Sequence, residues 1–350
     1  RTVWAFVQSM DLAPLYARIK SVAGRGGAPA IDPAILVALW LWATIDGVGS
    51  AREVDRLCER DDAYRWICGG VGVNYHSLAD FRTEHEAWLD AQLSRSIASL
   101  LDRRLVTLNA VAQDGLRVRA HAKAGSFRRR EKLAELHAQA QAQVQALKRE
   151  LTEDAGASAR RKQAAVERAA REREQRLAAA LATMDKLQRK PPPEAKTPKP
   201  SKRRGREGDD DLASPDATVA KPEPEAQPRV STTDAEARIM KMADGGFRPA
   251  FNAQLAVDAD TQLIAAVAIS NSGSDMGQMS PMHQDIQQRY DLTPDHWLAD
   301  GGFTKLQAID ELTARGTQPV VPPPRSRNPE VDPFEPKSTD TPAQAQWRDF

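Results

Sequence analysis

The stretch that most constrains the fold of this chain is Leu105 to Ala120, in which apolar and polar residues alternate around one acid, Asp114. The alternating apolar positions are Val106, Leu108, Ala110 and Ala112. This period of two predicts a β-strand with one buried side. Gly115 predicts a tight turn, after which a second short strand would carry Arg117 and Arg119 on one face close to Asp114. An acid beside cations is typical of phosphate chemistry, but Asp-Gly is also a common hairpin turn, and both interpretations stay open here.

The composition indicates a chain with room for about two domains, since 41% of its 350 residues are hydrophobic. The longest apolar run, Ala34 to Ile45, spans about 12 residues. A membrane helix needs roughly 20 apolar residues, so this run predicts a buried helix and no membrane contact. Cys58 and Cys68 have no ligand pair at zinc spacing and are expected to be reduced core thiols. Because the chain starts with Arg1 rather than Met, we expect a fragment at both ends.

Residues 1–100 predict a helical N-terminal domain. Asp32 and Pro33 form an N-cap followed by proline at the first helical position, which starts the apolar helix. Ser50 is the expected cap of the next helix, which carries Arg52 and Arg56. Short helices joined by glycine turns fit a helix-turn-helix-like DNA-binding bundle, and they fit other small helical domains equally.

Residues 126–190 predict an inserted helical hairpin, because Ala, Gln, Glu, Lys and Arg dominate and leucines recur at helical spacing. The two helices carry about seven more basic than acidic side chains. That excess suits a phosphate backbone, although a solvated antiparallel coiled coil explains the same pattern. Residues 191–229 are rich in proline and charge and predict a disordered linker.

The rest of the chain predicts an α/β domain. Two β-rich runs, 253–257 and 263–269, are followed by a helix near 275–290, a strand at 296–299, a helix at 303–315 and a strand at 318–321. This order predicts a ribonuclease-H-like catalytic domain formed by residues 101–125 and 230–350. The expected fold class therefore combines α+β and α/β features, with the helical and disordered insertion between the two parts.

A repeated pentapeptide supplies the second candidate acid. Ala-Asp-Gly-Gly-Phe occurs at Ala243 to Phe247 and again at Ala299 to Phe303. Asp300 ends an apolar strand and precedes a helix, which is where active sites of α/β sheets lie, whereas Asp244 precedes a hairpin. We therefore take Asp300 as the functional acid.

Asp114 and Asp300 together predict a divalent metal site. Two carboxylates on neighbouring strand ends do not both stay charged comfortably without a cation between them. Oxygen ligands with open positions suit Mg²⁺ or Mn²⁺, and a pair of such ions can activate an attacking oxygen and stabilise a leaving one in phosphoryl transfer. A complete site of this kind requires a third carboxylate.

Several motifs follow one another along the chain. They are Ser50-Ala-Arg-Glu-Val, Tyr64-Arg-Trp-Ile-Cys-Gly-Gly, His76-Ser-Leu-Ala-Asp-Phe-Arg, Val111-Ala-Gln-Asp-Gly, Ala235-Glu-Ala-Arg-Ile-Met-Lys, Phe251-Asn-Ala-Gln-Leu-Ala-Val-Asp and Leu298-Ala-Asp-Gly-Gly-Phe. In this order they resemble the bacterial insertion-sequence DDE transposases, specifically the subgroup with an InsH-type helical N-terminal domain. The resemblance spans nearly the whole chain.

The resemblance implies an enzyme that cleaves phosphodiesters and transfers strands at insertion-sequence ends. It implies that Asp114 and Asp300 are the first two members of the Asp-Asp-Glu triad and hold Mg²⁺ or Mn²⁺. The implied partners are double-stranded DNA, as terminal inverted repeats and target, and a second copy in a homodimer, in the nucleoid of the bacterial cytoplasm. The residues expected to contact DNA are Arg52, Arg56, Arg117, Arg119, Lys123, Arg128, Arg129 and Arg130.

The sequence departs from this family at the third acid. The family's Glu lies on a helix beyond the proline-rich segment, and no such helix is predicted after Pro322. Glu330 and Glu335 stand among prolines, and Glu311 is too near Asp300. We expect the third ligand beyond Phe350 and the chain as given to be incomplete as a catalyst. Two alternatives remain, a catalytically inactive DNA-binding remnant and a structural coiled-coil protein.

Overall fold

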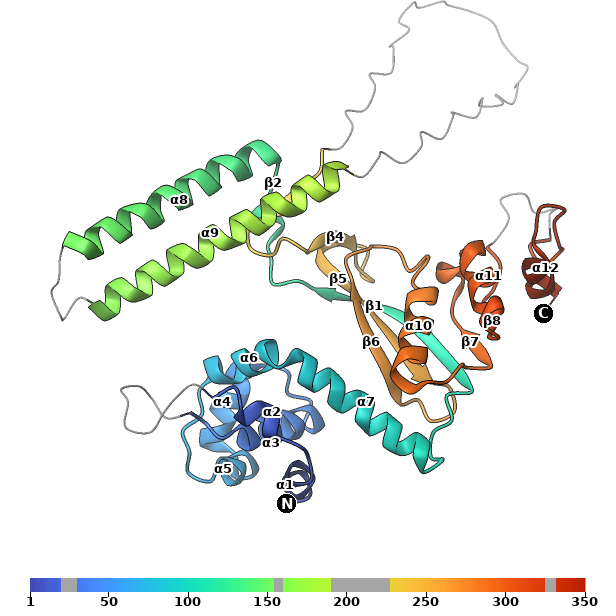
Figure 1. Ribbon diagram of the computed structural model, residues 1–350, viewed down its shortest axis with the longest axis horizontal. Helices are drawn as coiled ribbons and strands as arrows, with labels where there is room; N and C mark the ends of the chain where they lie inside the picture. Colours follow the sequence, from blue (N-terminus) through green and yellow to red (C-terminus); the bar gives the residue numbers. More distant parts are fainter. Residues whose placement is uncertain (20–29, 154–159, 190–226, 325–331, 350) are drawn as a thin grey trace, which may run out of the picture. The chain divides into compact units, whose positions relative to one another are not determined.

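The computed structural model describes residues 1–19, 30–153, 160–189, 227–324 and 332–349 (Figure 1). The chain divides into two compact units, one of Arg1–Leu108 with Ile286–Leu292 and one of Asn109–Asp285 with Thr293–Phe350. In these described ranges, no helix is both long enough and apolar enough to cross a membrane. The linker predicted at 191–229 lies outside the described residues except at its last three positions.

The first unit contains a bundle of short helices built around one buried helix. Its helices are α1 (Thr2–Gln8), α2 (Ala13–Tyr16), α3 (Pro33–Ile45), α4 (Ala51–Arg60), α5 (Asp62–Cys68), α6 (Tyr75–Glu84) and α7 (Glu86–Asp102). α3 is buried from Pro33 to Trp40 and forms the centre of the core. Both predicted caps are confirmed, because the side chain of Asp32 accepts from the N–H of Ala34 and that of Ser50 from Glu53. The seven-residue α5 was not predicted.

The second unit contains a six-stranded mixed sheet with β1 (Ala110–Arg119) inside it. β5 (Phe247–Asp258) pairs antiparallel with one side of β1, and β7 (His296–Leu298) pairs parallel with the other. β8 (Gln318–Val320) extends the sheet beyond β7, while β4 (Arg238–Lys241) and β6 (Ile264–Ser270) pair with β5. The mixed helical and sheet architecture is compatible with a ribonuclease-H-like DDE domain.

β1 differs from the predicted strand-turn-strand. It is one continuous strand through Asp114 and Gly115, so the predicted turn is wrong. Leu108 has a positive φ of 55° and lies just before the strand, which interrupts the expected alternation. Within β1 the buried positions are Val111 and Gln113, the opposite parity from the prediction. Pairing with β5, where Asp114 lies opposite Leu255 and Gly115 opposite Gln254, holds the Asp-Gly pair extended, whereas the local turn preference acts on the isolated tetrapeptide.

The predicted helical hairpin is present as α8 (Arg130–Glu153) and α9 (Arg160–Arg189). At its base, β2 (Phe127–Arg128) pairs with β3 (Val230–Ser231) and brings together the two ends of the insertion. Leu133, Leu177 and Met184 are buried between the helices. The hairpin is therefore joined to the sheet domain at both of its ends.

The predicted order of the last elements is confirmed, with α10 (Met279–Tyr290) before β7, and α11 (Leu306–Ala314) before β8. α10 lies on one face of the sheet, where the ring of His283 contacts Trp297 at a centroid distance of 5.2 Å. Among the described residues one helix, α12 (Pro342–Asp349), follows Pro322 and packs near α11, but it carries no glutamate and so is not the helix that the family resemblance calls for. Trp347 anchors α12 by donating to the carbonyl of Val321 at 2.9 Å.

Candidate functional site

Asp114 lies in the middle of β1, exposed on the face of the sheet that is turned away from α10. Side chains alternate along a strand, so Leu116 and Val118 share its face, and they are 57% and 45% exposed. Gln113 and Arg117 point to the opposite face, where Gln113 donates to the carbonyl of Gln278 at 3.2 Å. β1 therefore separates Asp114 from the polar side chains under α10.

Asp300 lies just beyond the carboxyl end of β7 and caps the short 3-10 helix Gly301–Phe303. Its Oδ1 accepts from the N–H of Gly302 at 2.8 Å. In the parallel ladder Ala112 pairs with Leu298, and two positions further along each chain are Asp114 and Asp300. The ladder ends at that pair, so Asp300 lies two residues beyond β7, at the end of the strand next to the one that carries Asp114.

The two acids have the donor chemistry of a hard cation site. One oxygen of Asp114 accepts from the N–H of Gly115, and one oxygen of Asp300 from Gly302. The second oxygen of each accepts no hydrogen bond from the described residues. Within those residues no group of three or more His, Cys, Asp or Glu side chains could hold a metal ion. Two carboxylates fit Mg²⁺ or Mn²⁺, and further ligands are needed to complete the shell.

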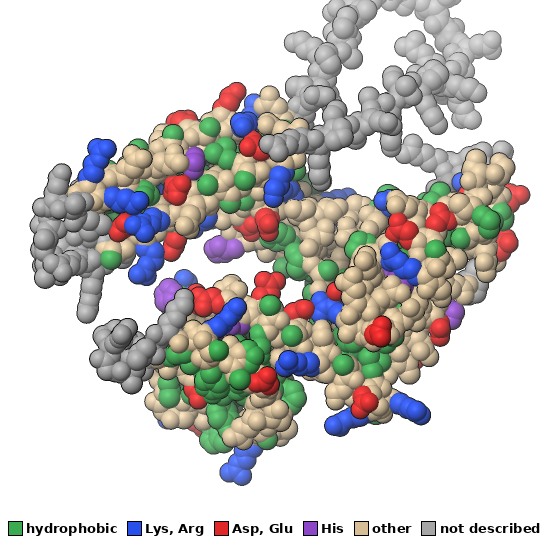
Figure 2. Space-filling view, in the orientation of Figure 1, with side chains coloured by type: hydrophobic (Ala, Val, Ile, Leu, Met, Phe, Trp, Pro, Cys, Tyr) green, Lys and Arg blue, Asp and Glu red, His purple; other side chains and the backbone are tan. Residues whose placement is uncertain are grey.

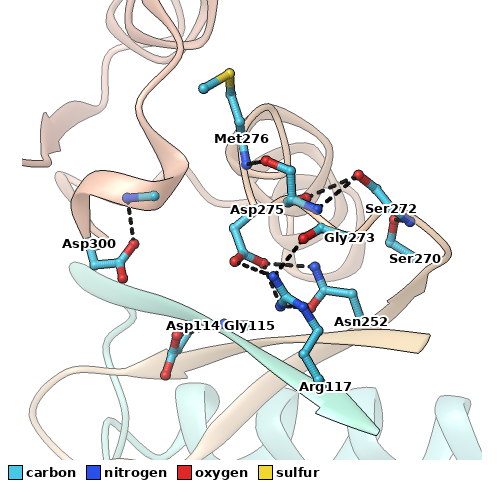
Figure 3. A network of polar contacts seen from close by, with 12 residues as sticks. Asp114, Gly115, Arg117, Asn252, Ser270, Ser272, Gly273, Asp275, Met276 and Asp300 are labelled. Carbon is cyan, nitrogen blue, oxygen red and sulfur yellow. Dashed lines mark hydrogen bonds and ion pairs between the residues drawn. The ribbon is translucent and has the colours of Figure 1, made fainter. Parts of the chain in front are cut away.

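Arg117 is not on the face of Asp114, contrary to the expectation that it lies close to that acid. Its guanidinium forms an ion pair with Asp275, with Nη2 to Oδ2 at 2.9 Å, and Nη1 also donates to Oδ1 of Asn252 at 2.8 Å. Figure 3 shows this cluster and the Asp114 carboxylate on opposite sides of β1. The cation is neutralised by Asp275, which lies in the segment between β6 and α10.

Asp275 accepts hydrogen bonds from three side chains. Oδ1 accepts from Asn252 at 2.7 Å and from Gln254 at 2.8 Å, in addition to the bonds from Arg117. Burial raises the pKa of the Asp275 carboxyl, but the hydrogen bonds from Arg117, Asn252 and Gln254 outweigh it and hold the pKa below its usual value. Asp275 is therefore a charged acceptor inside a nearly closed polar cluster.

The other basic residues expected to contact DNA are dispersed. Arg119, Lys123 and Arg129 are exposed. Arg128 donates to the carbonyls of Gly125 and Phe127, and Arg130 forms an ion pair with Asp185 at 2.8 Å. Figure 2 shows the Lys and Arg side chains of the hairpin mixed with acidic ones on the visible face.

In the helical unit, Arg52 and Arg56 both lie exposed on α4. Arg56 is paired with Glu53 one turn earlier, and the guanidinium of Arg52 stacks 5.0 Å from the centroid of the Tyr75 ring. Both side chains can still reach solvent and hence a ligand.

Asp244, the acid of the first pentapeptide, lies in the tight turn between β4 and β5. Hydrogen bonds from Arg248 and from the N–H of Gly246 lower the pKa of Asp244 to about 2. The two copies of the pentapeptide therefore have different surroundings. Asp244 lies in a turn and forms a salt bridge, whereas Asp300 lies just after the end of a sheet strand.

Of the acids considered for the third position, the two that the structure describes, Glu311 and Glu335, form no metal-holding group with Asp114 and Asp300. Glu311 lies on α11, where it accepts from Ser280 and Gln307. Glu335 is in a loop before α12, and Glu330 lies outside the described residues.

Sequence reasoning missed the cluster around Asp275. The available signal was Asn252 and Gln254 at alternate positions of an otherwise apolar strand, with Gln113 at the same parity on the neighbouring strand. Three amides on one buried face require partners, and that requirement predicts a charged or polar group packed above them.

Comparison with known families finds two matches. Residues 209–348 match the family described as Transposase DDE domain, and residues 3–84 match Transposase domain (DUF772). The first match contains Asp300 but not Asp114. Asp114 lies on β1, which pairs with β7 inside the matched region. No curated protein and no solved structure matches the chain.

Proposed function

The chain belongs to the insertion-sequence DDE transposases, and from this we propose that it cleaves phosphodiesters and transfers strands at the ends of an insertion sequence in a metal-dependent reaction. The observation that supports this most directly is the parallel pairing of β1, which carries Asp114, with β7, which ends two residues before Asp300. The two alternatives, an inactive DNA-binding remnant and a structural coiled-coil protein, are not favoured by the family matches.

Asp114 and Asp300 are the residues that would hold Mg²⁺ or Mn²⁺. Such an ion, when bound, polarises phosphoryl oxygens and stabilises developing negative charge. The two carboxylates would hold the ion, and both are exposed, which would leave room for a DNA phosphate beside them. We propose that the third acidic ligand comes from outside the described residues.

The proposed partner is duplex DNA, as terminal inverted repeats and as target, bound by a homodimer at the bacterial nucleoid. Lys123 and Arg129 are exposed cations close in sequence to Asp114, whereas Arg119, also exposed, has the strand parity of Arg117 and points to the other face of the sheet. Arg52 and Arg56 offer a second basic surface on the helical N-terminal unit, which we propose binds DNA. Arg128 and Arg130 have partners in the hairpin base and would contribute less. Arg117 is neutralised by Asp275 on the other face of the sheet and would not contact the DNA held at Asp114.

The repeated pentapeptide provides a matched test of the metal site. We expect Asp114→Asn and Asp300→Asn each to remove Mn²⁺ binding measured by calorimetry, because each removes one of two anionic ligands. Asp244→Asn changes the same residue in the same pentapeptide and should bind Mn²⁺ like the unmodified protein. Equal loss in all three variants, or in none, would contradict the assignment.

The same variants separate catalysis from binding. In a nicking assay on supercoiled plasmid carrying the element's two ends, a form of the protein that includes the third acidic ligand should make Mn²⁺-dependent nicks, and these should disappear with Asp114→Asn and Asp300→Asn while DNA binding persists. Binding of Mn²⁺ and DNA by that form without nicking would support the binding-only alternative instead.

A further inference from the structure

The back of the sheet behind Asp114 carries a continuous polar network that no part of the proposed reaction uses. It contains Arg117, Asn252, Gln254 and Asp275, and it continues through Gln113 to Trp297. These side chains come from β1, β5, β7 and the segment before α10. The network therefore contacts β1, which carries Asp114, and β7, which ends two residues before Asp300.

The network touches the backbone of β1 directly beside Asp114. A Cβ atom on Gly115 would lie 2.2 Å from Oδ1 of Asp275 and 2.7 Å from Nε2 of Gln254. Real Cβ atoms essentially never approach so closely, so only glycine leaves room for these two polar groups. The carboxylate of Asp275 thus rests on the residue that follows the candidate ligand.

Each hydrogen bond between β7 and Asp275 has its donor on the β7 side and its acceptor on the Asp275 side. Nε2 of Gln254 donates to Asp275, and Oε1 of Gln254 accepts from Gln113 at 2.8 Å. Oε1 of Gln113 then accepts from the indole N–H of Trp297 at 3.1 Å. A carboxylate can only accept hydrogen bonds. Asp275 therefore requires the N–H₂ group of Gln254 to face it, and this in turn directs the oxygen of Gln254 toward the N–H₂ group of Gln113.

The network is shielded and charge-assisted. The side chains of Arg117 and Asp275 are only 18% and 20% exposed, and Gln113 and Gln254 are buried. Hydrogen bonds between ionised groups in such surroundings are stronger and more directional than neutral ones. Trp297, at its far end, lies on β7 and precedes Asp300 by three residues.

We propose that Asp275 is a positioning residue for the metal site, acting through Gly115 and through the Gln254–Gln113–Trp297 chain to hold β1 and β7 in the register that aligns Asp114 with Asp300. This inference rests on the proposed function, since it assumes a metal at those two acids. Asp275 itself is not a ligand, because its oxygens accept from three side chains on the opposite face of the sheet. Partners behind metal ligands commonly change metal affinity when altered.

The test is Mn²⁺ affinity measured by calorimetry in variants of the whole chain that retain the unmodified circular dichroism spectrum at the assay temperature. Asp275→Asn keeps the size of the side chain but puts an N–H₂ group among donors, and it should weaken Mn²⁺ binding by about 10- to 100-fold. The matched control, Asp244→Asn, also removes a carboxylate paired with arginine on the same sheet and should leave affinity unchanged. Arg117→Lys keeps the charge without the forked geometry, and a smaller loss is expected.

Exchanging the carboxylate of Asp275 with the amide of Asn252 tests whether the lost Mn²⁺ affinity can be restored. The double variant Asp275→Asn with Asn252→Asp returns a carboxylate to the cluster, within reach of Arg117, and should recover part of the Mn²⁺ affinity. A merely structural role would lower the melting temperature without changing the affinity of the folded protein.

The outcomes separate this proposal from the metal site itself. Unchanged affinity in folded Asp275→Asn and Arg117→Lys, with binding lost in Asp114→Asn, would overturn the positioning role alone. Complete loss in Asp275→Asn without rescue by the exchange would make Asp275 a ligand and overturn it too. Unchanged binding in Asp114→Asn would overturn the metal site and the positioning role together.

Discussion

At the scale of single residues, His283 is one of two described residues that bury a side-chain polar atom without a hydrogen-bond partner, the other being Gln92. Nε2 of His283 lies 2.7 Å from Oγ1 of Thr317, which donates its own proton to the carbonyl of Pro294 at 2.6 Å. Nε2 must therefore carry a proton and donate, which leaves Nδ1 bare. Nδ1 is buried without a hydrogen-bond partner among the described residues. Protonating Nδ1 would therefore bury a positive charge whose N–H has no hydrogen-bond acceptor among the described residues.

This arrangement predicts an acid-sensitive step in stability. Burial, reinforced by the charge of Arg315, lowers the pKa of His283 to about 4. An unfolded histidine titrates near pH 6.5, so between about pH 6.5 and 4 the unfolded state takes up a proton that the folded state refuses. The free energy of unfolding should fall in that window by up to about 1.4 kcal/mol per pH unit.

Urea unfolding at pH 7, 6 and 5 measures the effect, and His283→Phe is the comparison because its ring does not titrate. The variant should be less stable at pH 7 and should lose less stability on acidification. Parallel pH curves for the two proteins would show that His283 does not carry the acid sensitivity.

At the scale of elements, the hairpin of α8 and α9 shows how a highly charged segment holds together with a narrow core. Buried small and medium side chains, such as Ala140 and Ala180, lie between the helices, and ion pairs such as Arg171 with Glu167 lie on the outside. Exposed ion pairs of this kind contribute little to stability. Exposed arginines on the hairpin can therefore bind a ligand such as DNA with little effect on the free energy of unfolding.

Three exposed arginines on α9 test this role. Replacing Arg168, Arg173 and Arg176 with Gln should weaken duplex DNA binding and reduce the slope of log K against log salt, by about 0.9 for each phosphate that is no longer neutralised. Fluorescence anisotropy at several salt concentrations measures both quantities. The control variant Glu172→Gln alters an exposed charge on the same helix and should not reduce the slope. An unchanged affinity and slope in the triple variant would leave the hairpin as a spacer.

At the scale of the whole molecule, the chain has two compact units with separate apolar interiors. The helical unit is built on residues such as Leu39, Val54 and Leu78, each 0% exposed, whereas the sheet unit buries residues such as Met240 and Ile309. Units with their own cores need not unfold together, and two-state behaviour commonly fails in such chains.

We therefore expect thermal unfolding in more than one transition. Leu78→Ala should lower one transition and Ile309→Ala the other, because each removes about 2–5 kcal/mol from its own core. Differential scanning calorimetry of the two variants and the unmodified protein checks this. A single transition shifted equally by both variants would show that the units unfold cooperatively.

The local signals in the sequence determined much of this protein. The caps at Asp32 and Ser50, the hairpin helices, the order of elements after residue 230 and the family membership could all be predicted, because each depends on neighbouring residues or on motif order. The choice of Asp300 over Asp244 also came from local context, and it stays a prediction.

Only the tertiary structure decided the course of β1 and what lies behind it. An Asp-Gly pair favours a turn when considered alone, but pairing with β5 keeps Asp114 and Gly115 extended and sends Arg117 to the far face. Asp275 is more than 150 residues from Arg117 in sequence, yet its carboxylate fills the space above Gly115. No local pattern contains that contact, because it depends on which strands become neighbours and in which register.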